Sequence, residues 1–156
     1  MQLDDDVKHH WRRTALSYLA FTITPIHYGY VLILLRQYVE GPPISIVGLE
    51  PDTALLRILA VVFSVTSFGE LAFARFMPRL LIREYKKRGA GPGLSCRGII
   101  TIQATAYSGI ALFGFVLGLL GAGWVVILPF LVIALVGFIV NFPTKKRFQA
   151  LLEKVD

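Results

Sequence analysis

Long apolar stretches separated by short polar or basic segments dominate the pattern of this chain. The longest, Gly98 to Phe142, contains no Asp, Glu, Lys, Arg or His and is interrupted in its middle by Gly121-Ala122-Gly123. Because a membrane-spanning helix needs about 20 apolar residues, this stretch is too long for one crossing. It predicts two spans, at about 98–120 and 124–142, joined by a tight turn.

Two earlier stretches predict two further spans, at about 14–37 and 54–80. The second is the costlier one, because it carries Arg57, Glu70, Arg75 and Arg79. Between the two spans, Gly41-Pro42-Pro43 cannot continue a helix. The pattern therefore predicts an all-α, polytopic integral membrane protein: a single membrane domain of four transmembrane helices in two hairpins.

Charge placement predicts the orientation of these spans. Three basic segments fall on the same side of the predicted helices: Lys8, Arg12 and Arg13; Arg79, Arg83, Lys86, Lys87, Arg88 and Arg97; and Lys145, Lys146, Arg147 and Lys154. The first loop carries Glu40, Glu50 and Asp52 and has no Lys or Arg. By the positive-inside rule, both termini and the loop at 81–97 lie in the cytoplasm.

The composition agrees with a membrane protein and narrows its partners. The chain is 55% hydrophobic and 17% charged, which is too apolar for a soluble domain. Its net charge of +6 is accounted for by the topology signals, so no nucleic-acid partner is expected. Lys86, Lys87 and Arg88 are candidates for contact with lipid headgroups, worth ~1 kcal/mol each near an anionic leaflet. Without organelle-targeting features, we expect a prokaryotic plasma membrane.

Polar residues within the spans are the candidates for chemistry. Glu70 comes first, because a carboxylate at membrane depth usually has a partner, a wet cavity or a proton-handling task. One interpretation makes Glu70 and His27 a proton relay, with Tyr107 among its hydroxyl neighbours. The other pairs Glu70 with Arg75 or Gln103 inside the bundle, or keeps it protonated, and leaves His27 with a hydrogen bond only.

The third predicted span has one face of small residues, which recur every three or four positions: Ala104, Ser108, Ala111, Gly114, Gly118 and Gly121. Gly114 and Gly118 form a G-x-x-x-G pair, a pattern that lets another helix approach closely. Packing within the chain and an interface with a second copy or another subunit both fit this face.

The C-terminal segment 144–156 predicts a short amphipathic helix. Phe148, Leu151, Leu152 and Val155 fall on one face, and lysines lie around the other. Such a helix fits either the lipid headgroup layer or a partner subunit. Before this segment, Asn141 and Pro143 mark the end of the last span.

Two stretches resemble a known hairpin. They are Glu70-Leu71-Ala72-Phe73-Ala74-Arg75-Phe76-Met77-Pro78 and, after a basic segment, QATAYSGIALFGFVL at 103–117. They resemble the hairpin of the rotary ATP synthase subunit c, where a helix ends in A-x-A-R-x-P and the outer helix reads E-A-x-A-x-Y/F-G-x-V. The resemblance covers under half of the chain. The family's ion-binding carboxylate would fall on Ser108, and its inner-helix glycine repeat is absent from 61–69, so rotor function is not implied.

No enzyme motif is present. The sequence has no G-x-S-x-G elbow, phosphate-binding loop or H-E-x-x-H, and a single cysteine, Cys96, excludes a disulfide or a cysteine zinc site within the chain. We therefore expect no metal and no cofactor. The prediction is a non-catalytic small membrane protein, a subunit or assembly partner of a larger membrane complex or a homo-oligomer. The alternative is a component of proton-coupled transport that uses Glu70 and His27.

Overall fold

The computed structural model describes residues 5–38, 53–89 and 91–155, and all regular structure within these ranges is helical. The expected acidic loop at 39–52 lies outside the described residues. The helices are α1 (Asp5–Tyr38), α2 (Thr53–Arg88), α3 (Pro92–Leu119), α4 (Trp124–Val140) and α5 (Lys145–Val155). The all-helical prediction is confirmed.

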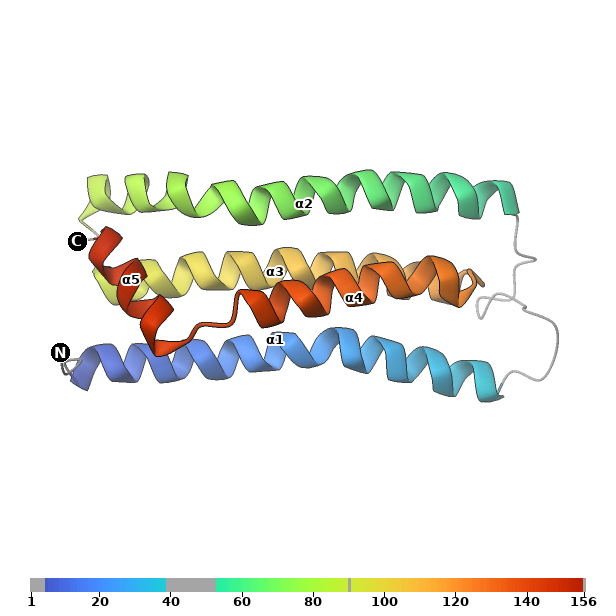
Figure 1. Cartoon of the computed structure of the whole chain (residues 1–156), viewed down its shortest axis with the longest axis horizontal. Coiled ribbons are helices and arrows are strands. Elements are labelled where there is room, and N and C mark those ends of the chain that lie inside the picture. Colours follow the sequence, from blue (N-terminus) through green and yellow to red (C-terminus); the bar gives the residue numbers. More distant parts are fainter. Residues whose placement is uncertain (1–4, 39–52, 90, 156) are drawn as a thin grey trace.

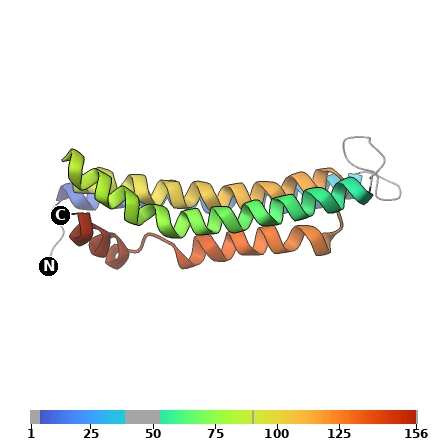
Figure 2. The ribbon, with the colours of Figure 1, turned by 90° about the horizontal axis from the view of Figure 1, so that it is seen from above.

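Helix α3 is the centre of the bundle. It packs against α1, α2, α4 and α5, and α1 and α2 lie on its opposite flanks (Figure 1). Helix α4 covers one side of this row, which is seen after a quarter turn (Figure 2). The predicted hairpin of the third and fourth helices is present, with its turn at Gly121, where φ is 90°. The first two helices do not pack together as a hairpin, because α3 lies between them.

Three helices, Lys8–Tyr38, Ala54–Arg88 and Gly93–Leu119, are long and apolar enough to cross a membrane. Helix α4 has 17 residues, about 26 Å at 1.5 Å per residue, and is followed by α5 after a bend of 74°. If the bent pair counts as one span, the number of candidate spans is four.

The expected loop at 81–97 is mostly helical, unlike the prediction. Helix α2 continues past Pro78 to Arg88, and α3 already begins at Pro92. The change from apolar to basic residues marks where a helix leaves hydrocarbon, but lysine and arginine are themselves good helix formers, so the helix does not stop there. It ends at Gly89, whose φ of 61° suits a glycine that closes a helix.

Polar contacts fasten α1 along its length to the α3–α4 hairpin. Near one end, the Trp11 indole N–H donates to the carbonyl of Pro143 at 2.8 Å. Further along, the Tyr18 hydroxyl donates to the Phe138 carbonyl at 3.1 Å. At the far end, Arg36 donates to the Ala122 carbonyl in the α3–α4 turn. The acceptors are backbone carbonyls near or just beyond helix C-termini, which have no partner within their own helix. The three bonds therefore fix the position of α1 against α3 and α4.

The small-residue face of α3 is used for packing within the chain. Ala104 and Ala111 are fully buried. A Cβ built on Gly114 would lie 2.8 Å from the Phe130 Cβ on α4, and one on Gly118 would lie 2.6 Å from a Leu32 methyl on α1. At these glycines α1 and α4 pack tightly on α3, as expected for small-residue packing in membranes.

Helix α5 confirms the predicted amphipathic segment and shows what covers its apolar face. The helix packs across α3 and α2 at the end where α2 finishes and α3 starts (Figure 1). Phe148 is fully buried, and Leu151 and Leu152 pack against the core. The apolar face is therefore occupied by the chain's own bundle.

Candidate functional site

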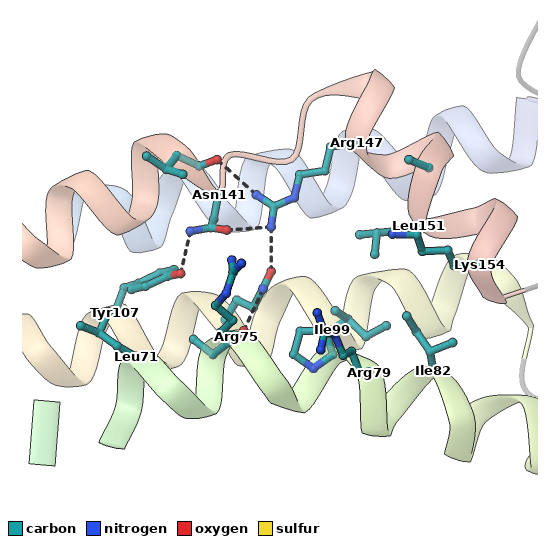
Figure 3. Close-up of a pocket in the computed structure, with 15 residues that line it drawn as sticks. Leu71, Arg75, Arg79, Ile82, Ile99, Tyr107, Asn141, Arg147, Leu151 and Lys154 are labelled. Carbon is teal, nitrogen blue, oxygen red and sulfur yellow. Dashed lines mark hydrogen bonds between the residues drawn. The ribbon is translucent and has the colours of Figure 1, made fainter. Parts of the chain in front are cut away.

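A cavity of about 510 Å³ lies where α5 crosses the other helices. The 74° bend after α4 sends α5 back over α2 and α3, and the space beneath that crossing is not filled by side chains. The cavity is lined from α2, α3, the end of α4 and α5 by Leu71, Ala74, Arg75, Pro78, Arg79, Ile82, Ile99, Gln103, Tyr107, Val140, Asn141, Arg147, Ala150, Leu151 and Lys154 (Figure 3).

The charges of the lining are all of one sign. Arg75 and Arg79 are one turn apart on α2, and Arg147 and Lys154 are two turns apart on α5, so each pair shares a helix face. In Figure 3 the Arg75 side chain extends from α2 toward Arg147 and Asn141. Among the described residues that line the cavity, none is Asp or Glu. The cavity therefore presents four cationic groups without a carboxylate to offset them.

Arg147 is the most firmly held of the four. Its guanidinium donates to the Asn141 Oδ1 at 2.8 Å, to the Gln103 Oε1 at 3.2 Å and to the Val140 carbonyl at 3.4 Å. Burial lowers the pKa of Arg147, but an arginine starts so high that it stays protonated. All three acceptors are neutral, so the guanidinium is positioned without being neutralised.

The two amides that hold Arg147 are themselves fixed. Gln103 is buried, and its Nε2 donates to the Ala74 carbonyl of α2 at 3.0 Å. Asn141 donates through Nδ2 to the Tyr107 hydroxyl at 2.6 Å and to the Gly137 carbonyl at 2.9 Å. Each amide thus turns its oxygen toward Arg147 and its nitrogen toward another helix. This network sets the position of a cation at the junction of four helices.

The structure brings together three of the predicted polar residues and separates two. Gln103, Tyr107 and Arg75 all line the cavity. His27 lies exposed on α1, on the opposite flank of α3 from Glu70 on α2. The geometry therefore provides no direct contact between Glu70 and His27 for the relay interpretation.

Glu70 lies against the α2–α3 contact and outside the cavity. A Cβ on Gly109 of α3 would be 2.6 and 2.7 Å from its two carboxylate oxygens. Its Oε2 is buried without a hydrogen-bond partner among the described residues, as are the hydroxyls of Ser67 and Ser108.

Sequence reasoning missed four residues of the site: Arg79, Asn141, Arg147 and Lys154. Asn141 does end α4, as its position suggested, but its side chain also holds Arg147. Arg147 itself was counted among the topology signals. The available signal was the pairing of Arg75 with Arg79 at one-turn spacing inside an apolar helix, with no acidic residue within one turn on that face.

The headgroup candidates Lys86, Lys87 and Arg88 are exposed in the last turn of α2. Arg88 pairs with Glu84 at 2.9 Å on the same helix, an exposed pair of small energetic value. These residues lie outside the cavity lining, so they offer a diffuse positive surface beside it.

No family model, curated protein or solved structure matches this chain. Within the part of the chain that the structure describes, no group of three or more His, Cys, Asp or Glu side chains could hold a metal ion.

Proposed function

We propose that this chain is a non-catalytic, four-span membrane protein that binds a phosphate-type anion in its cationic cavity, at the cytoplasmic surface. The start of α1, the end of α2, the start of α3, the end of α4 and all of α5 lie at the same end of the bundle (Figure 1). The three basic segments belong to that end, which supports a cytoplasmic location by the positive-inside rule.

The observation that carries the proposal is the uncompensated charge of the cavity. Arg75, Arg79, Arg147 and Lys154 line one space, and its described lining has no carboxylate. Arg147 is partly buried, whereas Arg75, Arg79 and Lys154 are exposed. Like charges around one space repel one another, so an anion bound between them is favoured. A phosphate oxygen matches a guanidinium in charge and in hydrogen-bond geometry, so a phosphate group is the natural complement.

The test is the thermal stability of the full chain in mild detergent, titrated with inorganic pyrophosphate and compared with sodium chloride at equal ionic strength. A ligand at about 100 times its Kd stabilises a folded protein by about 2.7 kcal/mol. We expect this stabilisation in the wild type and its loss in the double variant Arg75→Gln/Arg79→Gln.

The matched control is Arg12→Gln/Arg13→Gln, which removes the same charge from exposed positions on α1, outside the cavity lining. This control should respond to pyrophosphate as the wild type does. Equal responses of the two double variants would show that net charge, and not the cavity, is responsible, and the proposal would be wrong.

A second candidate is a subunit or assembly partner of a larger membrane complex, or a homo-oligomer. The observation that favours it is the poor burial of α2, a helix of 36 residues in which only Ser67 and Ala74 are buried among the described residues. Its outer face is apolar and uncovered by the chain. Migration in mild detergent distinguishes the cases: a partner on this face predicts a larger particle that Val65→Arg disrupts, whereas lipid alone predicts a monomer.

A further inference from the structure

An apolar groove between α2 and α4 adjoins the cationic cavity. This groove, of about 230 Å³, is lined by Ser64, Ser67, Phe68, Leu71, Pro129, Phe130 and Ile133. Leu71 lines both the groove and the cationic cavity. The two spaces are therefore neighbours along α2, with the charged one on one side of Leu71 and the apolar one on the other.

One face of α2 lines both the cationic cavity and the apolar groove, which together form one track along the helix. Ser64, Ser67, Leu71, Arg75 and Arg79 follow one another at intervals of three or four residues, which keeps them on the same side of a helix. From Leu71, the charged part reaches Arg79 over about 12 Å and the apolar part reaches Ser64 over about 11 Å at 1.5 Å per residue. One leaflet contributes about 15 Å of a hydrocarbon core about 30 Å thick. The apolar part thus spans most, but not all, of the depth of a single leaflet.

We propose that the occupant of this track is an anionic phospholipid of the cytoplasmic leaflet, with its phosphate in the cationic cavity and one acyl chain in the α2–α4 groove. This inference rests on the proposed anion-binding function and names the ligand class. Charge complementarity selects the anionic headgroup, and basic pockets between transmembrane helices at the cytoplasmic side are suited to such lipids.

The apolar groove is the feature that favours a lipid over a soluble anion as the ligand. A free phosphate would use the cationic cavity alone, and nothing about it would require an apolar extension into the membrane. An acyl chain adds contact along Phe68, Phe130 and Ile133, in a site built mostly of apolar side chains with a few convergent polar groups. The lipid therefore satisfies both halves of the track with one molecule.

The experiment measures lipid retained by the full chain in mild detergent, by native mass spectrometry, after addition of dioleoyl phosphatidylglycerol or dioleoyl phosphatidylcholine. We expect one retained phosphatidylglycerol and about tenfold weaker retention of phosphatidylcholine, a difference of about 1.4 kcal/mol. Arg75→Gln/Arg79→Gln should remove this preference. Equal retention of the two lipids by the wild type would overturn the proposal.

Groove variants test the acyl chain. Ser64→Leu fills the groove, and its matched control is Thr66→Leu, because both hydroxyls donate to the carbonyl four residues earlier but Thr66 is exposed and outside the groove. Ile133→Trp, with Val132→Trp as its control, fills the groove from α4. Retention of phosphatidylglycerol should fall about tenfold in each groove variant and in neither control.

The headgroup without its chains, glycerol 3-phosphate, separates failure of this inference from failure of the proposed function. We expect it to bind at least about tenfold more weakly than the lipid and to be insensitive to Ser64→Leu. If it binds as tightly as the lipid and the groove variants change nothing, the occupant is a soluble anion and only the lipid inference is wrong. If neither ligand responds to Arg75→Gln/Arg79→Gln, both proposals are wrong.

Discussion

The tight α3–α4 contact at Gly114 leads to a quantitative prediction for the variant Gly114→Ala. The added methyl group would lie 2.8 Å from the Phe130 Cβ and 3.2 Å from the Ile127 carbonyl oxygen. Neither atom is the far end of a flexible side chain, so α3 and α4 must move apart to accept the methyl. Overpacking of this kind costs about 1–3 kcal/mol.

The control is Gly69→Ala on α2, where an added Cβ would meet nothing within 4 Å. Both substitutions replace a glycine inside a helix, so both gain the same helix propensity, about 1 kcal/mol in water. The difference between the two variants isolates the packing cost. We expect Gly114→Ala to have a free energy of unfolding about 1–3 kcal/mol below that of Gly69→Ala.

The assay is unfolding of the purified chain by sodium dodecyl sulfate in mixed micelles, followed by tryptophan fluorescence at two protein concentrations. A cost that does not depend on concentration belongs to packing within the chain. If Gly114→Ala proved as stable as Gly69→Ala, the close α3–α4 contact would be refuted. If the cost appeared only at high concentration, the small-residue face would be an interface between copies.

Three further predictions concern the ends of the bundle. Trp11→Phe removes the 2.8 Å donor to the Pro143 carbonyl and should lower the free energy of unfolding by about 1 kcal/mol, measured in the same mixed micelles. Arg147→Lys keeps the positive charge but replaces the planar guanidinium, which donates to three acceptors, by an ammonium group. Pyrophosphate binding, measured by calorimetry, should therefore weaken about tenfold. Unchanged binding would contradict a role for the guanidinium geometry. In a chain without its natural cysteine, a single cysteine at Lys146 should react with an impermeant thiol reagent only in inverted vesicles, and one at Gly123 only in intact cells.

Hydropathy predicted the helices well, because each apolar stretch of about 20 residues can be recognised in the sequence independently of the others. The apolar run at 98–142 became α3 and α4 with a turn at Gly121, as expected. The same reasoning placed the end of α2 too early, since a basic segment such as 83–88 shows where a helix leaves lipid and not where its hydrogen bonding stops.

The neighbours of each helix could not be predicted in the same way. Every span is apolar on most sides, so hydropathy gives no preference for the pairing of α1 with α2 or with α3. The small face of α3 indicated close packing without naming the partner, and the structure places Leu32 of α1 and Phe130 of α4 against it. The prediction that Glu70 could meet His27 depended on a contact between α1 and α2, and the insertion of α3 removes that contact.

The cationic cavity was hidden for a related reason. When they are read along the chain, Arg79, Arg147 and Lys154 have a sufficient explanation as topology signals, and Arg75 has one as a partner for Glu70. Only the bend after α4 brings residues from two basic segments, about 70 positions apart, around one space. The Arg75–Arg79 pair is visible along the chain, but its convergence with Arg147 and Lys154 is a property of the tertiary structure that no local pattern reports.

The cavity places the proposed lipid beside α2, the helix with the smallest buried fraction among the described residues. Within the described residues, α2 is buried only at Ser67 and Ala74, and both lie along the track that the lipid would follow. A phosphate bound between Arg75 on α2 and Arg147 on α5 would neutralise charges that otherwise repel across the cavity. An acyl chain between α2 and α4 would fill a gap that these helices do not close themselves. The bound lipid would thus take the place of a direct α2–α4 contact, so that removal of lipid should loosen α2 before any other helix.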